Sequence, residues 1–186
     1  MSRSAIASIS LPALQHNLDR VRTLAPRSKV MAVVKADGYG HGLERVARAL
    51  ASADAFGVAA IADGLRLRAA GFRQRIVVLS GIDEAADLAE VRRLGLDIVI
   101  HHESQLRLLE ADRQAAPVRV WLKLDTGMHR LGFPHAQARA LLSRLRALAC
   151  VAPEIPVMSH FANSDVPDDP MNTLQMERFR AATDGL

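Results

Sequence analysis

The sequence has 186 residues, of which 49% are hydrophobic and 24% charged, an ordinary balance for a globular protein. Its formal net charge of +4 does not indicate a nucleic-acid partner, because the basic residues are scattered and aromatic side chains that could stack on bases make up only 4%. No apolar run approaches the roughly 18 residues that span a bilayer, and the N-terminus is a poor secretory signal. The single cysteine, Cys150, excludes an internal disulfide. We therefore expect a cytoplasmic protein without nucleic-acid or membrane partners.

Short apolar runs alternate with helical patterns along the chain. The first pattern predicts a helix with Ser10 as N-cap, Pro12 in the first turn, and Leu14, Leu18 and Val21 on one face. The β-rich runs are residues 29–35, 55–61, 75–80, 97–101, 118–125 and 155–160. The later helical patterns are residues 43–50, 63–70, 83–94, 103–114, 134–150 and a last stretch from Met171.

This repetition of strand and helix predicts an α/β fold with a parallel sheet, covered by helices because the strands are apolar throughout. A doubly wound sheet and a (β/α) barrel both fit. The chemically distinctive residues follow the first, fifth and sixth strands, and in both folds the functional site lies at the carboxyl ends of the strands. Because three such segments must converge on one site, we favour a TIM-type (β/α)8 barrel.

Lysine is used sparingly in this sequence. Of the 24 basic residues, only Lys29, Lys35 and Lys123 are lysines. Lys35 and Lys123 stand at the ends of strand-like runs, "VMAVVK" and "VRVWLK". A lysine can lose its proton and attack a carbonyl group, whereas an arginine cannot in practice. These two lysines are therefore candidates for chemistry, although a lysine at a strand end also serves simply to reach solvent.

Residues 33–42, "VVKADGYGHG", place three glycines at alternate positions after Lys35. The spacing matches neither GxxxxGK[ST] nor GxGxxG, so a phosphate-binding loop and a flexible strand-to-helix turn both remain open. The phenol of Tyr39 could donate a hydrogen bond to a phosphate, or the ring could pack on the rim of the barrel.

Two further segments carry polar side chains after predicted strands. In residues 123–133, "KLDTGMHRLGF", the planar guanidinium of Arg130 could bind a carboxylate, or it could lie in a surface turn. In residues 159–165, "SHFANSD", His160 could bind a metal, transfer a proton or orient a neighbour. Because the sequence has neither HExxH nor closely spaced His and Cys, we expect no metal. The absence of GxSxG argues against a serine hydrolase.

Together, "AVVKADGYGHG", "KLDTGMHRLGF" and "SHFANSD" resemble the N-terminal barrel of the alanine racemase family, fold-type III enzymes that use pyridoxal 5'-phosphate. The resemblance implies that Lys35 carries the cofactor and that Tyr39 contacts its phosphate. It places Arg130 beside the cofactor's phenolic oxygen and the substrate carboxylate. Lys123 matches a position that is often carbamylated, which gives a negative group that holds this arginine. His160 matches the histidine that supports the hydrogen bonds beside the cofactor ring.

The sequence departs from the family at one motif, which usually reads KANAYGHG. Here Asp37 and Gly38 replace the asparagine and the alanine. We expect this change to have little effect on the chemistry and to add some flexibility to the loop.

The resemblance also implies an activity: a homodimer that racemises alanine and supplies D-alanine for peptidoglycan. In the family, the lysine is the base on one face of the substrate, and a tyrosine from the second domain of the partner subunit is the base on the other. The only tyrosine here is Tyr39, and the family's C-terminal β-domain would lie beyond Leu186. We therefore expect residues 1–186 to form a partial cofactor-binding barrel of about six βα units. We also expect it to be C-terminally truncated and inactive by itself.

Two alternatives stay open. One is a non-catalytic barrel that binds pyridoxal phosphate for cofactor homeostasis; that family shares the fold and the lysine but lacks "DTGMHRLGF". The other is an amino-acid racemase of broader specificity, because residues of the second domain often set the size of the substrate.

Overall fold

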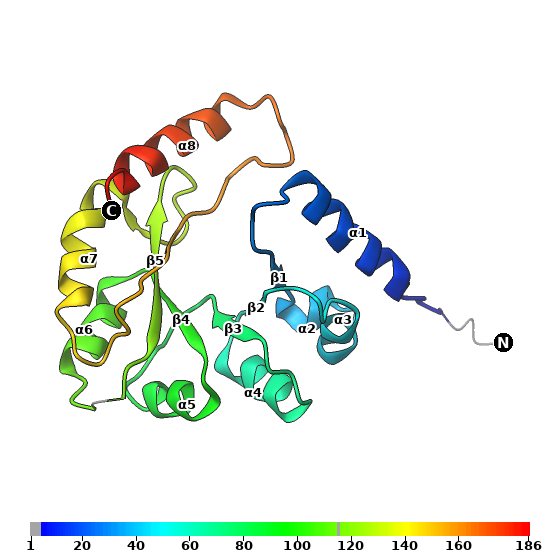
Figure 1. Ribbon diagram of the computed structural model, residues 1–186, viewed down its shortest axis with the longest axis horizontal. Coiled ribbons are helices and arrows are strands. Elements are labelled where there is room, and N and C mark those ends of the chain that lie inside the picture. Colours follow the sequence, from blue (N-terminus) through cyan, green and yellow to red (C-terminus); the bar gives the residue numbers. More distant parts are fainter. Residues whose placement is uncertain (1–4, 115) are drawn as a thin grey trace. The chain divides into compact units, whose positions relative to one another are not determined.

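The computed structural model describes residues 5–114 and 116–186, and Figure 1 shows the order of the elements. The chain divides into two compact units, one up to Val77 and one from Val78 onward, and each is described by itself. None of the described helices is both long enough and apolar enough to cross a membrane.

The first unit alternates short strands and helices. Its elements are α1 (Leu11–Leu24), β1 (Met31–Val33), α2 (Lys35–Tyr39), α3 (Leu43–Ala49), β2 (Ala55–Val58) and α4 (Ile61–Ala69), and β3 (Arg75–Val78) begins at its end. Strands β1 and β2 are parallel, with Ala32 opposite Phe56 and Val33 opposite Gly57. Phe56 is fully buried and meets the ring of Phe72 edge-on, with 5.6 Å between the ring centroids. The parallel pairing of β1 and β2 confirms the βα pattern predicted for this part of the chain.

The first helix begins where the sequence predicts. The Ser10 hydroxyl accepts a hydrogen bond from the amide of Ala13 at 3.3 Å, and proline occupies the first turn. Its predicted apolar face is only partly covered, because Leu18 is buried whereas Val21 remains 47% exposed.

The second unit is organised around a long strand. Its elements are α5 (Asp87–Leu94), β4 (Asp97–Ile100), α6 (Glu103–Ala111), β5 (Arg119–Asp125), β6 (Phe133–Pro134), the 3₁₀ turn η1 (His135–Gln137), α7 (Ala138–Arg146), β7 (Val157–Met158) and α8 (Pro170–Thr183). Strands β4, β6 and β7 each pair with β5, and all three pairings are parallel. The carboxyl ends of β4, β5 and β7 therefore share one edge.

The core of this unit consists mainly of buried apolar side chains. All four residues of β4 are buried, and Leu106 and Leu109 of α6 are fully buried as well. Helices α6 and α7 lie side by side (Figure 1), and Arg144 of α7 joins them by donating to Glu103 and Glu110.

The amino-terminal ends of the strands carry a buried carboxylate. Asp97 has no exposed surface and accepts hydrogen bonds from Arg119 Nε at 2.5 Å and Trp121 Nε1 at 2.9 Å. A buried carboxylate is stable only when donors satisfy it in this way. This end of the sheet thus contributes to stability, in contrast to the opposite end described below.

Several predicted boundaries are wrong, and the reasons are local. The helix predicted at residues 83–94 begins only at Asp87, whose carboxylate accepts the amides of Asp83 and Glu84 and so holds these preceding residues in a turn outside the helix. The pattern at residues 134–150 divides into η1 and α7, after a short strand, β6, that was not predicted. The run at residues 155–160 pairs only over β7, because Pro156 has no amide to donate.

Candidate active site

In the first unit, the candidate residues begin with Lys35, which lies two residues beyond the end of strand β1. Strand β1 ends at Val33, and pairing continues only through the amide of Val34, which donates to the carbonyl of Gly57 at 2.8 Å. Lys35 therefore does not end the strand but begins α2, and its side chain is half-buried. The prediction of a lysine at a strand end is thus wrong by two residues, whereas its place after a parallel strand is confirmed.

The segment after Lys35 has a left-handed backbone. The φ angles of Ala36, Asp37, Gly38 and Tyr39 are 51°, 53°, 64° and 55°. This conformation costs roughly 1–2 kcal/mol per non-glycine residue, and only a supporting environment makes it persist. Backbone hydrogen bonds supply part of that support, because the amide of Gly38 donates to Val34 at 2.9 Å and that of Gly40 to Ala36 at 3.0 Å.

Gly38 is buried where the left-handed segment touches α3. A Cβ atom at this position would lie 2.9 Å from Cγ2 of Val46. The carboxylate of Asp37 accepts a hydrogen bond from the amide of Leu43, at the start of α3, at 3.1 Å. The two residues that depart from the family motif thus join the segment to α3, a role different from the added flexibility expected from the sequence.

Tyr39 is the last residue of the left-handed segment, and its side chain is 58% exposed. Nδ1 of His41 lies 2.9 Å from the carbonyl oxygen of Tyr39 and 3.2 Å from that of Gly38. Both partners are acceptors, so Nδ1 carries the proton and donates. Sequence reasoning gave no role to His41, whose only signal was its place within "GYGHG".

In the second unit, the candidate residues begin with Lys123. This residue lies in β5 opposite Met158 of β7, and it is only 8% exposed. Two residues later, the Asp125 carboxylate accepts the amides of Gly127 at 2.9 Å and His129 at 3.1 Å. Burial opposes ionisation of Asp125, but these amides and the nearby His129 ring outweigh burial and hold its pKa below the usual value. Asp125 thus shapes the turn that follows β5, a role that the sequence did not indicate.

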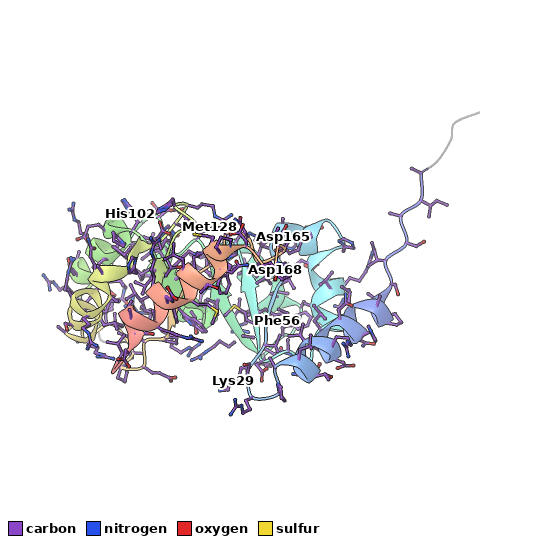
Figure 2. All side chains as sticks on the ribbon, turned by 90° about the horizontal axis from the view of Figure 1, so that it is seen from above. Lys29, Phe56, His102, Met128, Asp165 and Asp168 are labelled. Carbon is purple, nitrogen blue, oxygen red and sulfur yellow. The ribbon has the colours of Figure 1, made fainter. Side chains whose placement is uncertain are left out.

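Arg130 lies in this turn with its side chain exposed, two residues after Met128, which Figure 2 labels. The turn closes at Gly132, where an added Cβ atom would stand 2.6 Å from the amide nitrogen of Asp125. Only glycine permits so close a return, and it lets Phe133 pair with Leu124. Arg130 is therefore presented on a short turn fixed at both ends.

The segment with His160 meets the same turn. The hydroxyl of Ser159 donates to the carbonyl of Leu124 at 2.9 Å and lies 2.7 Å from the hydroxyl of Thr126. His160 is exposed and lines a cavity of about 310 Å³, together with Thr126, Ser159, Phe161, Gln175 and Phe179. The structure thus brings together the two segments that carry Arg130 and His160. Lys35 and Tyr39 lie in the first unit, four positions apart.

One residue that sequence reasoning missed connects these segments. Gln175 of α8 is 1% exposed, and its Oε1 accepts the amide of Ala162 at 2.9 Å. Its Nε2 donates to the hydroxyl of Thr126 at 3.1 Å and to the carbonyl of His160 at 2.9 Å. The chain reaches α8 through the segment in which Figure 2 labels Asp165 and Asp168. A buried amide between two distinctive segments cannot be recognised from sequence, because glutamine on a helix is usually exposed.

A second histidine lies at the carboxyl end of β4. Burial lowers the pKa of His101, although the Ser80 carbonyl, 3.0 Å from Nε2, raises it. His101 is therefore neutral at pH 7. Within residues 5–114 and 116–186, no three His, Cys, Asp or Glu side chains are grouped so that they could hold a metal ion.

The donor set suits one kind of ligand. A lysine amine attacks an aldehyde, and a phenol, a guanidinium and an imidazole bind anionic oxygens. Lys35, Tyr39, Arg130 and His160 all follow parallel strands at their carboxyl ends, where sites in such folds lie. Within the first unit, the amine of Lys35 and the phenol of Tyr39 suit the aldehyde and the phosphate of pyridoxal 5'-phosphate; within the second unit, Arg130 and His160 suit anionic oxygens such as its phenolic oxygen.

The comparisons with known proteins agree with this chemistry. The family described as "Alanine racemase, N-terminal domain" matches residues 9–186. An alanine racemase of Shewanella loihica is 52% identical over 180 residues, which cover 97% of this chain and 50% of that protein. One of Thioalkalivibrio sulfidiphilus is 51% identical over 185 residues, or 98% of this chain and 51% of that protein. The crystal structure of the biosynthetic alanine racemase from Pseudomonas aeruginosa superposes with a TM-score of 0.88 at 40% identity, covering 94% of this chain and 49% of that one.

The parallel βα units thus belong to a TIM-type barrel, which confirms the predicted fold class. The chain belongs to the alanine racemase family, in the part that forms its N-terminal domain. It spans about half the length of the curated relatives that it matches.

Proposed function

We propose that this protein interconverts L- and D-alanine with pyridoxal 5'-phosphate bound at Lys35. The observation that carries the proposal is the local geometry of that lysine: a half-buried residue two positions after a parallel strand, followed by a left-handed backbone segment that contains Tyr39. The family match across residues 9–186 supports it. All eight curated relatives considered are named alanine racemases, which favours alanine over a broader substrate range and a catalytic protein over a cofactor carrier.

When bound, the cofactor supplies an electron-withdrawing ring that acidifies the α-hydrogen of an amino acid. The side chains of this protein do the rest. Lys35 would hold the cofactor at its aldehyde carbon, and its amine would accept or return the α-proton on one face of the substrate. Tyr39 donates its phenolic hydrogen to the phosphate. Arg130 binds the substrate carboxylate and the phenolic oxygen with its planar guanidinium, and His160 supports the hydrogen bonds beside the ring.

We also propose that Lys123 carries a carbamate, as the family resemblance implies. Lys123 lies within β5 and is 8% exposed, and by the family resemblance a carbamate there would be the negative group that holds Arg130. With ¹³C-bicarbonate, the wild-type protein should give a carbamate resonance that Lys123→Ala lacks. A bare amine at this position, shown by an identical spectrum of the two proteins, would contradict the proposal.

The biological setting follows from the same proposal. We infer a cytoplasmic homodimer in which the partner subunit supplies the proton-transfer group for the second face of alanine. The D-alanine produced would supply peptidoglycan synthesis.

The test is exchange of the α-hydrogen of each alanine enantiomer in deuterated water with added pyridoxal phosphate, measured on the whole protein in which residues 1–186 form the N-terminal domain; residues 1–186 alone should exchange little. We expect deuterium to enter both L- and D-alanine together with inversion. Exchange without inversion would leave Lys35 as the only working base and contradict racemisation. A protein that binds the cofactor but exchanges neither enantiomer would favour a cofactor-homeostasis role.

A further inference from the structure

The left-handed segment between Lys35 and Tyr39 needs more support than its own backbone provides. Three of its four left-handed residues, Ala36, Asp37 and Tyr39, are not glycine. Such residues keep this conformation only where the surroundings fix them. The side chain in the middle of the segment, that of Asp37, makes the contacts that reach beyond it.

Asp37 joins three elements through one oxygen atom. Its Oδ1 accepts the amide of Leu43 at the start of α3 and also Nη2 of Arg66 on α4, at 3.1 and 2.9 Å. The Leu43 amide and the guanidinium of Arg66 lower the pKa of Asp37, so the carboxylate is charged at neutral pH.

Arg66 is fixed in turn by a second carboxylate. Its Nε and Nη2 each lie 3.0 Å from an oxygen of Glu44 on α3, which is the forked pairing that guanidinium and carboxylate prefer. The hydrogen bonds from Arg66 lower the pKa of Glu44, and Asp63 adds an ion pair at 3.9 Å. We call Arg66, Asp37 and Glu44 the Arg66 bridge.

An exposed ion pair usually contributes little, and the side chain of Arg66 is 44% exposed. The Arg66 bridge differs because its pairing with Glu44 is forked and because it links a left-handed residue to two helices. Its effect therefore lies in the geometry of residues 35–43 rather than in the global free energy of unfolding.

We propose that Arg66 is a positioning residue: through Asp37 and Glu44 it holds the left-handed segment and so sets how Lys35 and Tyr39 engage the cofactor. The inference rests on the proposed function, since it assigns the segment to pyridoxal phosphate. Arg66 acts through Asp37, whose backbone lies between the two cofactor residues.

The test compares Arg66→Met with Arg93→Met. Arg93 is a matched control, because it makes a similar forked and exposed pair with Glu90 on α5. In the protein without cofactor, we expect Arg66→Met to speed amide hydrogen exchange at Gly38, Gly40 and Leu43 by about tenfold, since it removes a charge-assisted hydrogen bond. Arg93→Met should leave these amides unchanged.

The second readout is the cofactor itself. We expect Arg66→Met to raise the dissociation constant of pyridoxal phosphate by about tenfold and to alter its bound absorption spectrum, whereas Arg66→Lys, which keeps the charge but not the fork, should lie between. Unchanged exchange in Arg66→Met overturns the proposal, and so does faster exchange with wild-type cofactor affinity and spectrum. If the wild-type protein does not bind pyridoxal phosphate, the proposed function fails and the inference with it. The amide hydrogen exchange measurement uses no cofactor. It therefore shows whether Arg66 holds the left-handed segment independently of whether the protein binds pyridoxal phosphate.

Discussion

Replacing Lys35 by alanine is expected to abolish racemisation, with kcat reduced by roughly 10⁴-fold or more, because the change removes both the covalent anchor of the cofactor and one proton acceptor. The fold should survive. Lys35 is half-buried and begins α2, and the backbone hydrogen bonds that hold the segment come from Val34, Ala36 and the glycines. The measurement is racemisation of alanine by the whole protein in which residues 1–186 form the N-terminal domain, followed in parallel with far-ultraviolet circular dichroism.

A second measurement separates loss of the anchor from a general loss of activity. Treatment with pyridoxal phosphate and borohydride, followed by digestion and mass spectrometry, should label Lys35 in the wild-type protein and nothing in Lys35→Ala. Lys29, which Figure 2 labels, is the matched control, because it lies exposed just before β1. Lys29→Ala should keep both the label and the activity. Labelling at Lys29, or substantial racemisation by Lys35→Ala, would contradict the assignment.

Much of the fold could be predicted because its signals are local. The first helix begins with a serine cap and a proline, and each of these residues indicates where the helix starts to within one turn. The apolar strands and the spacing between them indicate parallel βα units. The boundary of the predicted helix at residues 134–150 is wrong because it depends on strand pairing with a distant segment, which the local sequence does not indicate. Residues 133–134 pair with β5 only because Gly132 lets the chain return onto Asp125.

The candidate functional residues could be predicted from the sequence, whereas the residues that support them could not. Lys35, Tyr39, Lys123, Arg130 and His160 are recognisable because their motifs follow apolar runs, and the structure places each after or within a parallel strand. The supporting residues are not recognisable. The contact of Asp37 with Arg66 spans 29 positions, and that of Gln175 with Thr126 spans 49. No sequence period connects positions so far apart, and only the folded chain shows them as partners.

Replacing Gln175 by leucine should cause the largest loss of stability among single changes at the site. Leucine has a similar volume but cannot form the hydrogen bonds that Gln175 makes with the amide of Ala162, the hydroxyl of Thr126 and the carbonyl of His160. A buried polar group that loses its partner costs about 1–3 kcal/mol, and the change removes three hydrogen bonds although Thr126 keeps its contact with Ser159, so we expect a total loss of about 2–4 kcal/mol. Urea unfolding at pH 7 measures this loss as a lower midpoint.

The same change should weaken catalysis through geometry. Gln175 fixes Thr126, which precedes Arg130 in the turn after β5, and it fixes the backbone of His160. A shift of these segments should raise KM for alanine more than it lowers kcat, because Arg130 is proposed to bind the substrate carboxylate. Gln137→Leu is the control, because Gln137 is exposed in η1 and should change stability by less than about 0.5 kcal/mol. If Gln175→Leu unfolds at the same urea concentration as Gln137→Leu and keeps its KM, the buried amide does not hold the two segments together.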